Sequence, residues 1–289
     1  MISSLLNRLK LYAQLTRLNR PIGWLLVLWP TLWGLWLATD GKPPIHLVII
    51  YTLGAIAMRS AGCVINDYAD RNFDSHVERT KDRVLATGKV TVKEAWAVFA
   101  VLVLLAFALV LLTNTLTLYL AVGGLVLACS YPFMKRYTHL PQVVLGAAFA
   151  WGIPMAFASA QNHVPQQAWL IYFTVVLWTV VYDTFYAMVD RDDDLRIGIK
   201  STAVLFGDQD RVITASLQVL VIIGLLLMGS RFELNNFYYL GVAAAAGLFI
   251  YQQRLIRYRQ RGPCFNAFLN NNWVGVVIFI AIIAGQFNS

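Results

Sequence analysis

The stretch from Ile45 to Asp74 reads IHLVIIYTLGAIAMRSAGCVINDYADRNFD, and it joins an apolar run to an acidic segment. A membrane-spanning helix needs about 20 mostly apolar residues, and residues 45–65 meet that requirement. The nine residues that follow, from Asn66 to Asp74, include three aspartates. Carboxylates at the end of a spanning helix are costly and are usually functional. This stretch therefore predicts a membrane protein with a polar site at one of its surfaces.

The rest of the chain has the same apolar character. Of its 289 residues, 58% are apolar and 13% are charged, whereas soluble domains have about 45–50% and about 25%. No polar stretch is long enough to fold separately, so we expect one integral membrane domain over residues 1–289. We expect an all-α fold, a polytopic membrane helix bundle with about nine transmembrane helices. The predicted spans are residues 22–39, 45–65, 94–112, 115–134, 141–160, 167–187, 212–230, 236–253 and 270–286.

Basic side chains gather on one side of this predicted topology. If the N-terminus and the loops after every second span share one side, that side holds 20 of the 23 lysine and arginine residues. Such residues are enriched in cytoplasmic loops, so we expect a cytoplasmic N-terminus. The net charge of +8 then reflects membrane topology, and nucleic acid is not an expected partner.

A second acidic segment reads DRDDD from Asp190 to Asp194 and follows the predicted span 167–187. Both acidic segments come after even-numbered spans, so the topology places them on the same side of the membrane. We therefore expect them to form one site.

Helical spacing brings the carboxylates of each segment onto one face. At about 100° per residue, the first set falls within an arc of about 60° and the second within about 40°. The two sets are Asp67, Asp70 and Asp74, and Asp183, Asp190 and Asp194. Like charges at such spacing repel, so we expect a cation between them. No histidine or cysteine is interleaved, and Mg²⁺ is the hard cation that suits carboxylates and substrate phosphate.

Basic residues surround both acidic segments. Magnesium together with arginine and lysine is how proteins hold a phosphorylated leaving group, which makes a diphosphate the expected ligand. These loops would also be basic under the positive-inside rule, so each residue keeps a purely topological alternative. The residues are Arg71, Arg79, Lys81, Arg83, Lys135, Arg136, Arg191, Arg196 and Lys200.

Arg59 stands alone in an apolar run, seven residues before Asn66. An arginine inside a membrane helix is expensive and must pair with an acid, a carbonyl or a ligand anion. Its offset from Asn66 places it on nearly the same helix face, directed toward the acidic site. Pairing with an aspartate of the bundle, such as Asp183, is the structural alternative.

At these residues the chain resembles the UbiA superfamily of membrane prenyltransferases, whose signatures are NDxxDxxxD and DxxxD. The flanking strings LTRLNRPIGWLLVLWPTLWGLW, YPFMKRYTH and YDTFYAMVDRDDDLRIGIKSTAVLFG resemble the bacterial 4-hydroxybenzoate polyprenyltransferase branch. One position departs from the pattern, because Val84 follows the arginine of the TKDR string where the family usually has proline.

The resemblance implies an enzyme of the bacterial inner membrane with its active site on the cytoplasmic side. It would transfer a polyprenyl group from polyprenyl diphosphate to the ring carbon ortho to the hydroxyl of 4-hydroxybenzoate. The products would be 3-polyprenyl-4-hydroxybenzoate and diphosphate, in ubiquinone biosynthesis. The polyprenyl tail would lie between apolar helices, open to membrane lipid. The residues implied to hold two Mg²⁺ ions are Asn66, Asp70, Asp74, Asp190 and Asp194.

The resemblance also gives expected roles to the remaining residues. The diphosphate would contact Lys81, Lys135 and Arg136, and the other candidate substrate-binding residues are Arg79, Lys200 and Tyr186. Either Arg59 or Arg20 is expected to bind the carboxylate of the acceptor. Either Asp183 or Asp67 is expected to take the ring proton.

Two alternatives remain open. The shared motifs also suit prenyl transfer to another acceptor, such as a naphthoate, homogentisate or haem. A cation-coupled membrane transporter would also contain intramembrane carboxylates. It would need them near the midplane with broken helices, whereas both acidic segments lie at span ends.

Overall fold

The computed structural model describes residues 2–72, 74 and 79–287. Within these residues the chain forms twelve α-helices and two short 3-10 helices, with no strand. The predicted all-α fold is therefore confirmed. The helices are α1 (Ile2–Leu15), α2 (Ile22–Ala38), α3 (Ile45–Asp70), α4 (Val92–Val110), α5 (Thr115–Met134), α6 (Pro141–Ala150), α7 (Gly152–Gln161), α8 (Gln166–Ile197), α9 (Thr202–Phe206), η2 (Gly207–Gln209), α10 (Asp210–Arg231), α11 (Asn236–Leu255), η3 (Ile256–Tyr258) and α12 (Arg261–Gly285).

Helices occupy every window that the sequence predicts to span. In the described part of the chain, seven helical segments are long and apolar enough to cross a membrane. The two predicted spans outside that set fall on α2, which has only 17 residues, and on α11, which ends in the polar run from Gln252 to Arg254. The chain is thus a multi-pass membrane protein, but the predicted count of about nine spans is not confirmed.

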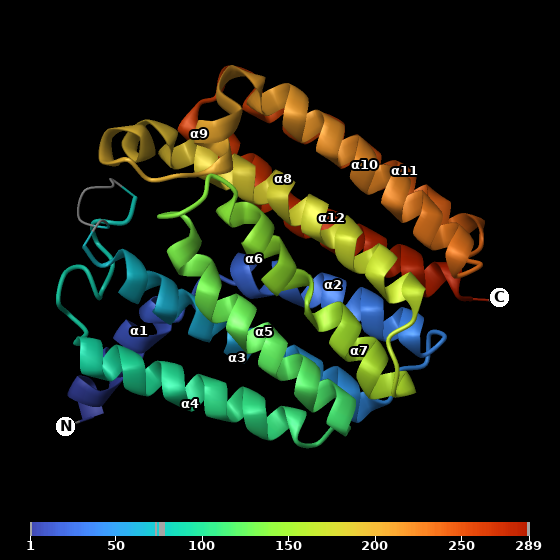
Figure 1. Ribbon diagram of the computed structural model, residues 1–289, viewed down its shortest axis with the longest axis horizontal. Coiled ribbons are helices and arrows are strands. Elements are labelled where there is room, and N and C mark those ends of the chain that lie inside the picture. Colours follow the sequence, from blue (N-terminus) through green and yellow to red (C-terminus); the bar gives the residue numbers. More distant parts are fainter. Residues whose placement is uncertain (1, 73, 75–78, 288–289) are drawn as a thin grey trace.

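The long helices lie side by side and are connected so that the ends of α3 and α8 come to the same end of the bundle (Figure 1). The turn between α5 and α6 reaches toward the same end, which is on the left and at the top of the view. Helix α1 lies beside this end, where Arg8 donates to the backbone oxygen of Lys89 at 3.0 Å. The two acidic segments are therefore close in space although far apart in sequence.

Helix α8 is the most deeply buried long helix, with 67% of its apolar window inside the bundle. Trp178 of α8 stacks on Trp33 of α2 with 5.3 Å between ring centroids, and Asn271 of α12 accepts a hydrogen bond from the Trp178 indole at 2.8 Å. Bonds of this kind hold helices together where lipid leaves little hydrophobic driving force between them. The packing fixes α8, and with it the second acidic segment.

The second acidic segment is helical because α8 continues ten residues past the predicted end of its span, to Ile197. Gly198 then adopts a left-handed conformation with φ of 73°. Glycine reaches this conformation without a Cβ penalty. The chain turns back there, so that Ser201 and Thr202 pack against the bundle as buried residues.

The predicted span 141–160 is divided into α6 and α7 at Trp151. The Trp151 indole donates to the backbone oxygen of Leu120 at 2.7 Å. A Cβ added at Gly124 would lie 2.7 Å from the Trp151 ring, so only glycine leaves room for it. Pro154, in the first turn of α7, has no N–H to donate to the carbonyl of Ala150, so the helical hydrogen bonding is interrupted at this point.

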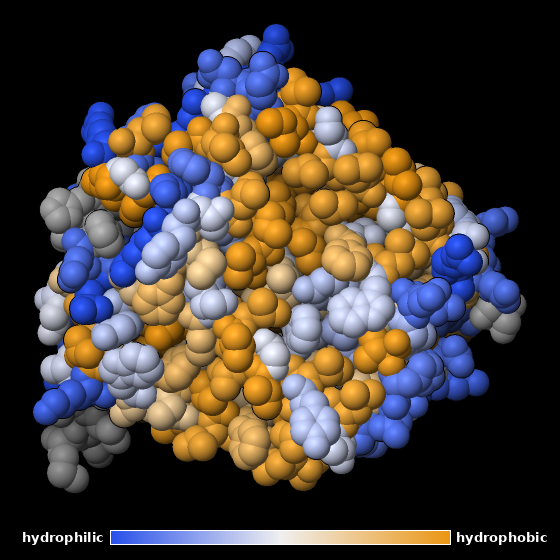
Figure 2. Space-filling view, viewed as in Figure 1, coloured by the Kyte–Doolittle hydropathy of each residue, from blue (hydrophilic) through white to orange (hydrophobic). Residues whose placement is uncertain are grey.

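The outer surface is apolar over the middle of the bundle. Figure 2 shows an orange face across the molecule, with blue side chains gathered at its two ends. In α4 only 11% of the apolar window is buried, and the same holds for α5. Exposed apolar side chains on these helices include Val101, Leu104, Val122 and Val126. Such a band suits contact with lipid and sets the polar ends at the two membrane surfaces.

Candidate active site

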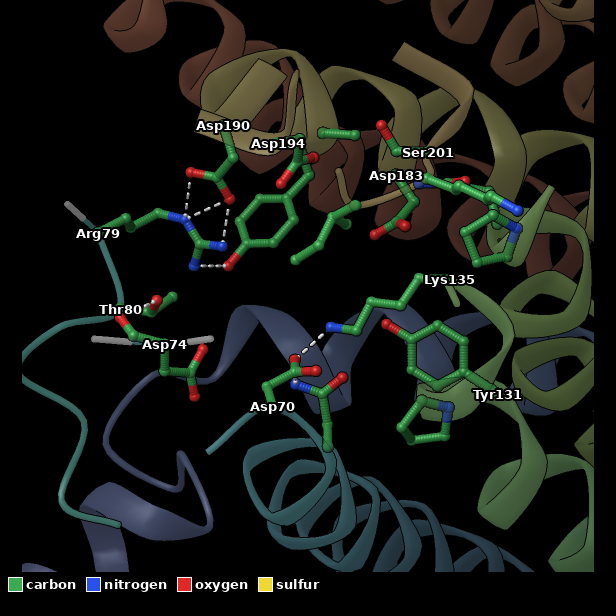
Figure 3. Close-up of a pocket in the computed structure, with 18 of the residues that line it drawn as sticks. Asp70, Asp74, Arg79, Thr80, Tyr131, Lys135, Asp183, Asp190, Asp194 and Ser201 are labelled. Atoms are coloured by element: carbon green, nitrogen blue, oxygen red, sulfur yellow. Dashed lines mark hydrogen bonds and ion pairs between the residues drawn. The ribbon is translucent and has the colours of Figure 1, made fainter. Parts of the chain in front are cut away.

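One cavity lies between the ends of α3 and α8, and both acidic segments line it. Figure 3 shows Asp70 pointing into it from α3, while Asp190 and Asp194 face Asp70 and Asp74 from α8. The two acidic segments therefore meet at one cavity, as the sequence predicts. The sequence-predicted residues that line the cavity are Asn66, Asp70, Asp74, Arg79, Lys135, Asp183, Tyr186, Asp190, Asp194 and Lys200.

On the α3 side, cations pair with the carboxylates. Lys135, at the end of α5, donates to one carboxylate oxygen of Asp70, and Asn66 donates to the same oxygen at 3.2 Å. Arg83 donates to both oxygens of Asp74 at 2.9 Å. Burial raises the pKa of the Asp74 carboxyl to about 6, against the lowering effect of Arg83. Asp74 lies beyond the end of α3, so it reaches the cavity from the loop and not from a continued helix.

On the α8 side, Arg79 crosses the cavity mouth to Asp190. Its Nη2 atom lies 2.5 Å from a carboxylate oxygen, and its guanidinium also donates to the Tyr186 hydroxyl. The same guanidinium sits 4.4 Å from the centre of the Tyr186 ring, and that ring packs on Phe268 with centroids 4.7 Å apart. Tyr186 is thus packed in the bundle and also lines the cavity, where we expect it to bind substrate.

Asp67 has a different environment from the other acidic residues. It is 2% exposed and pairs with Arg17 at 2.6 Å and with Arg83 at 3.2 Å. It does not line the cavity. The helical arc groups Asp67 with Asp70, but its side chain turns toward the chain segment after α1. These contacts make Asp67 an anchor for that segment.

Four further residues with a predicted substrate-binding role are not among those that line the cavity. Arg59 Nη1 donates to the Cys63 sulfur at 2.7 Å, and Arg59 Cζ lies 5.5 Å from the centre of the Phe149 ring. The buried Nε of Arg59 has no hydrogen-bond partner within the described part of the chain. Arg136 donates to the backbone oxygen of Ala69 at the end of α3, at 2.5 Å. The other two, Arg20 and Lys81, are exposed.

Arg83, which the sequence places among the basic residues around the acidic segments, also lines the cavity. Several other cavity residues are missing from the sequence prediction. Their side chains carry no charge, so composition and spacing do not single them out. They become visible only once α5, α6 and the turn after α8 are placed around the cavity. These residues are Thr80, Tyr131, Pro132, Pro141, Gln142, Ala187, Ile199 and Ser201.

The donor set of the cavity suits a hard divalent cation. Asp70 keeps a buried carboxylate oxygen, Oδ1, with no hydrogen-bond partner among the described residues, and Asp190 and Asp194 lie across the cavity from it (Figure 3). Among the described residues no three such side chains are close enough to form a complete metal site. Arginine and lysine hold several of the oxygens, so a metal here would complete its coordination with substrate phosphate and water.

A membrane-embedded helix bundle that directs carboxylates and cations into one cavity at its polar end suits an enzyme that acts on a phosphorylated lipid. Residues 27–283 match the model of the UbiA prenyltransferase family, and the chain belongs to this family. The resemblance seen in the two acidic motifs is thereby confirmed.

Curated relatives match over nearly the whole chain. A protein of Marinobacter nauticus named 4-hydroxybenzoate octaprenyltransferase is 60% identical, covering 95% of this chain and 94% of its own. A protein of the same name from Photobacterium profundum is 56% identical and covers 96% of both chains.

Solved structures share the fold. A UbiA homologue from Aeropyrum pernix is similar with a TM-score of 0.79 and 25% identity, over 90% of this chain and 96% of that one. A UbiA homologue from Archaeoglobus fulgidus, described as bound to GPP and Mg²⁺, has a TM-score of 0.70 and 20% identity, over 96% and 98% of the two chains. Because the Archaeoglobus fulgidus protein is only 20% identical, its similarity to this chain shows the fold alone.

Proposed function

We propose that this protein transfers a polyprenyl group from polyprenyl diphosphate to the carbon ortho to the hydroxyl of 4-hydroxybenzoate. The product is 3-polyprenyl-4-hydroxybenzoate, and the reaction belongs to ubiquinone biosynthesis. The name of the curated relatives supports this acceptor, and it supports an octaprenyl donor. The observation that carries the proposal is the meeting of Asp70 and Asp74 with Asp190 and Asp194 across one cavity.

The two acidic segments would hold Mg²⁺ beside the diphosphate. The residues that would bind the ion are Asn66, Asp70 and Asp74 on one side, and Asp190 and Asp194 on the other, all of which line the cavity. When bound, Mg²⁺ stabilises the negative charge that develops on the departing diphosphate. The structure of a UbiA homologue with GPP and Mg²⁺ supports a divalent ion in this family.

The cations of the cavity neutralise the remaining charge of the diphosphate. Arg79, Lys135 and Lys200 line the cavity and can turn from carboxylate or backbone partners to phosphate oxygens. Arginine offers forked hydrogen bonds, and lysine acts as a point charge. Lys81 and Arg136 lie outside the cavity and act at its entrance in this proposal. The diphosphate is thereby bound at the polar end of the bundle while the polyprenyl tail extends along its apolar helices.

The acceptor side uses Asp183 as base and Arg59 as the partner of the acceptor carboxylate. The C–O bond between the allylic carbon and the diphosphate breaks, and its electron pair leaves with the diphosphate. The ring carbon ortho to the phenol hydroxyl then bonds to the allylic carbon. Asp183 takes the proton from that ring carbon, which restores the aromatic ring. Apolar cavity walls such as Pro132 and Ile199 limit water, which would otherwise trap the allylic cation.

The site faces the cytoplasm in this proposal, within the inner membrane of a bacterium. Arginine and lysine are concentrated in the segments that meet at the cavity end, in keeping with the positive-inside rule. The whole chain acts as one membrane domain.

Membranes containing the protein provide the direct test. They are given Mg²⁺, octaprenyl diphosphate and ring-labelled 4-hydroxybenzoate, and lipid-extractable label is measured. The wild-type protein forms labelled product, whereas Asp70→Ala and Asp190→Ala do not. No product with wild type, or full activity in both variants, would overturn the proposal. Parallel assays with a naphthoate, homogentisate and haem test the other acceptors.

A further inference from the structure

Gln142 is a buried polar residue that lines the cavity. It is the second residue of α6, directly after Pro141, and it is 4% exposed. Its Oε1 atom accepts a hydrogen bond from the backbone N–H of Thr202 at 3.1 Å. The carbonyl oxygen is therefore held by α9, which leaves the amide NH₂ group to donate to another acceptor, and the Asp183 carboxylate of α8 lines the same cavity.

The neighbours of Gln142 are fixed as well. The hydroxyls of Thr184 and Thr202 lie 2.7 Å apart, and both residues are fully buried. Thr184 follows Asp183 directly on α8, so a continuous chain of contacts runs from Gln142 through Thr202 and Thr184 back to Asp183. The amide thus has little freedom to rotate relative to the carboxylate.

Asp183 differs from the carboxylates of the acidic motifs in how it is held. It lines the cavity, but among the described residues it forms no ion pair within 4.0 Å, whereas Asp70, Asp74 and Asp190 do. A carboxylate that has no ion pair is oriented by the hydrogen bonds that it accepts. The NH₂ group of Gln142, whose carbonyl oxygen is already held by Thr202, is a donor of the same cavity lining.

We infer that Gln142 is a positioning residue for prenyl transfer, because it holds the Asp183 carboxylate in the orientation that receives the ring proton of the acceptor. This inference rests on the proposed function. A base must lie within hydrogen-bond reach of the proton that it takes, so a rotated carboxylate slows this step more than it affects diphosphate binding. If Gln142 served only to connect α6 with α9, its replacement would not change the rate of proton removal.

The test compares Gln142→Met with Gln218→Met in the full-length protein. Gln218 is the matched control because it is 3% exposed, and it bonds to Gln252 and Gln253 at 3.0 and 2.9 Å in the bundle, outside the cavity lining. Rates are measured with ordinary 4-hydroxybenzoate and with 4-hydroxybenzoate deuterated at both carbons ortho to the hydroxyl. A primary isotope effect reports directly on proton removal.

We expect Gln142→Met to lower kcat by about tenfold, with the KM for octaprenyl diphosphate unchanged and an isotope effect larger than that of wild type. Gln218→Met changes thermal stability but leaves the isotope effect at the wild-type value. An isotope effect in Gln142→Met equal to that of wild type overturns the inference while leaving the proposed function intact. If Gln142→Met does not fold, Gln142→Asn takes its place, since the shorter amide cannot reach both Thr202 and Asp183. Absence of product with wild type is the separate outcome that overturns the proposed function.

Discussion

Arg79 donates hydrogen bonds from Nε to both carboxylate oxygens of Asp190, each at 3.0 Å, across 111 positions of sequence. The contact joins the segment after α3 to the end of α8 and so links the two acidic motifs directly. A second ion pair, between Lys135 at the end of α5 and Asp70 of α3, also joins two elements at the cavity. Cations and carboxylates therefore alternate around the cavity, and a ligand that carries both metal and phosphate can pair with each of them.

The first prediction concerns Arg79. In Arg79→Gln the diphosphate loses a charged donor, so the KM for octaprenyl diphosphate rises by at least about tenfold, as expected for a hydrogen bond to a charged group. The KM for 4-hydroxybenzoate stays unchanged. Both constants are measured in the membrane assay.

Arg261→Gln is the control for this variant. Arg261 pairs with Asp193 of the same acidic segment at 3.2 Å, but neither residue lines the cavity. The Arg261→Gln variant should therefore leave the KM for octaprenyl diphosphate at the wild-type value. Equal increases in the two variants would mean that Arg79 acts only by fixing α8.

The second prediction separates the aspartates of the second motif. Asp190→Asn and Asp194→Asn remove negative charge from the cavity and should lower kcat by about 10²–10³-fold, the range for loss of one group that stabilises a transition-state charge. Asp193→Asn removes the same charge from the same helix but away from the cavity, and it should retain most of the activity. A comparable loss in Asp193→Asn would show that the net charge of the segment matters more than its geometry.

The third prediction concerns Arg59 and the acceptor. Arg59→Met should raise the KM for 4-hydroxybenzoate by about tenfold, because a charged partner of its carboxylate is lost. An acceptor analogue in which an uncharged amide replaces the carboxylate should show no difference between the variant and wild type. Equal KM values of the two proteins for 4-hydroxybenzoate would assign its carboxylate to another residue.

Gly23 offers a milder perturbation of the same arginine. A Cβ at this position would lie 3.0 Å from Arg59 Nε and 3.1 Å from Nη2, so the guanidinium must move in Gly23→Ala. We expect the KM for 4-hydroxybenzoate to rise, and we expect no additional effect of Gly23→Ala when Arg59→Met is already present. Additive effects on KM would count against a shared cause.

The fourth prediction concerns membrane orientation. Arg196, near the end of α8, and His163, before its start, are both exposed and lie at opposite ends of this helix. Single cysteines at these positions are labelled with a membrane-impermeant thiol reagent. Arg196→Cys should react in inverted vesicles and His163→Cys in intact spheroplasts. The reverse pattern would place the site outside the cytoplasm.

The sequence predicts the helices well because apolar run length controls which segments can span a bilayer. It misses α1, whose 14 residues are too short for a span and whose partners include Glu94 of α4, the acceptor of a bond from Tyr12 at 3.0 Å. Run length contains no information about such contacts. It also misses the division at Trp151, where Pro154 removes the hydrogen bond to the carbonyl of Ala150.

The sequence predicts those parts of the site that depend on spacing within one helix, and it misses those that depend on contacts between distant segments. Helical spacing brings Asp190 and Asp194 to one face, since α8 continues through both. The same reasoning fails to separate Asp67 from Asp70, because the choice depends on Arg17, which lies 50 positions before Asp67. Gln142 carries no sequence signal at all, because its importance comes from the two helices beside it.

The central claim is that both acidic motifs bind one metal–diphosphate unit. Its most direct test is the amount of Mn²⁺, used in place of Mg²⁺, that the purified protein retains with an unreactive thio analogue of prenyl diphosphate, measured by electron paramagnetic resonance. We predict that wild type retains Mn²⁺ only when the analogue is present, and that Asp70→Asn and Asp190→Asn each lose most of it. Retention at the wild-type level in either variant would contradict a site shared by the two motifs.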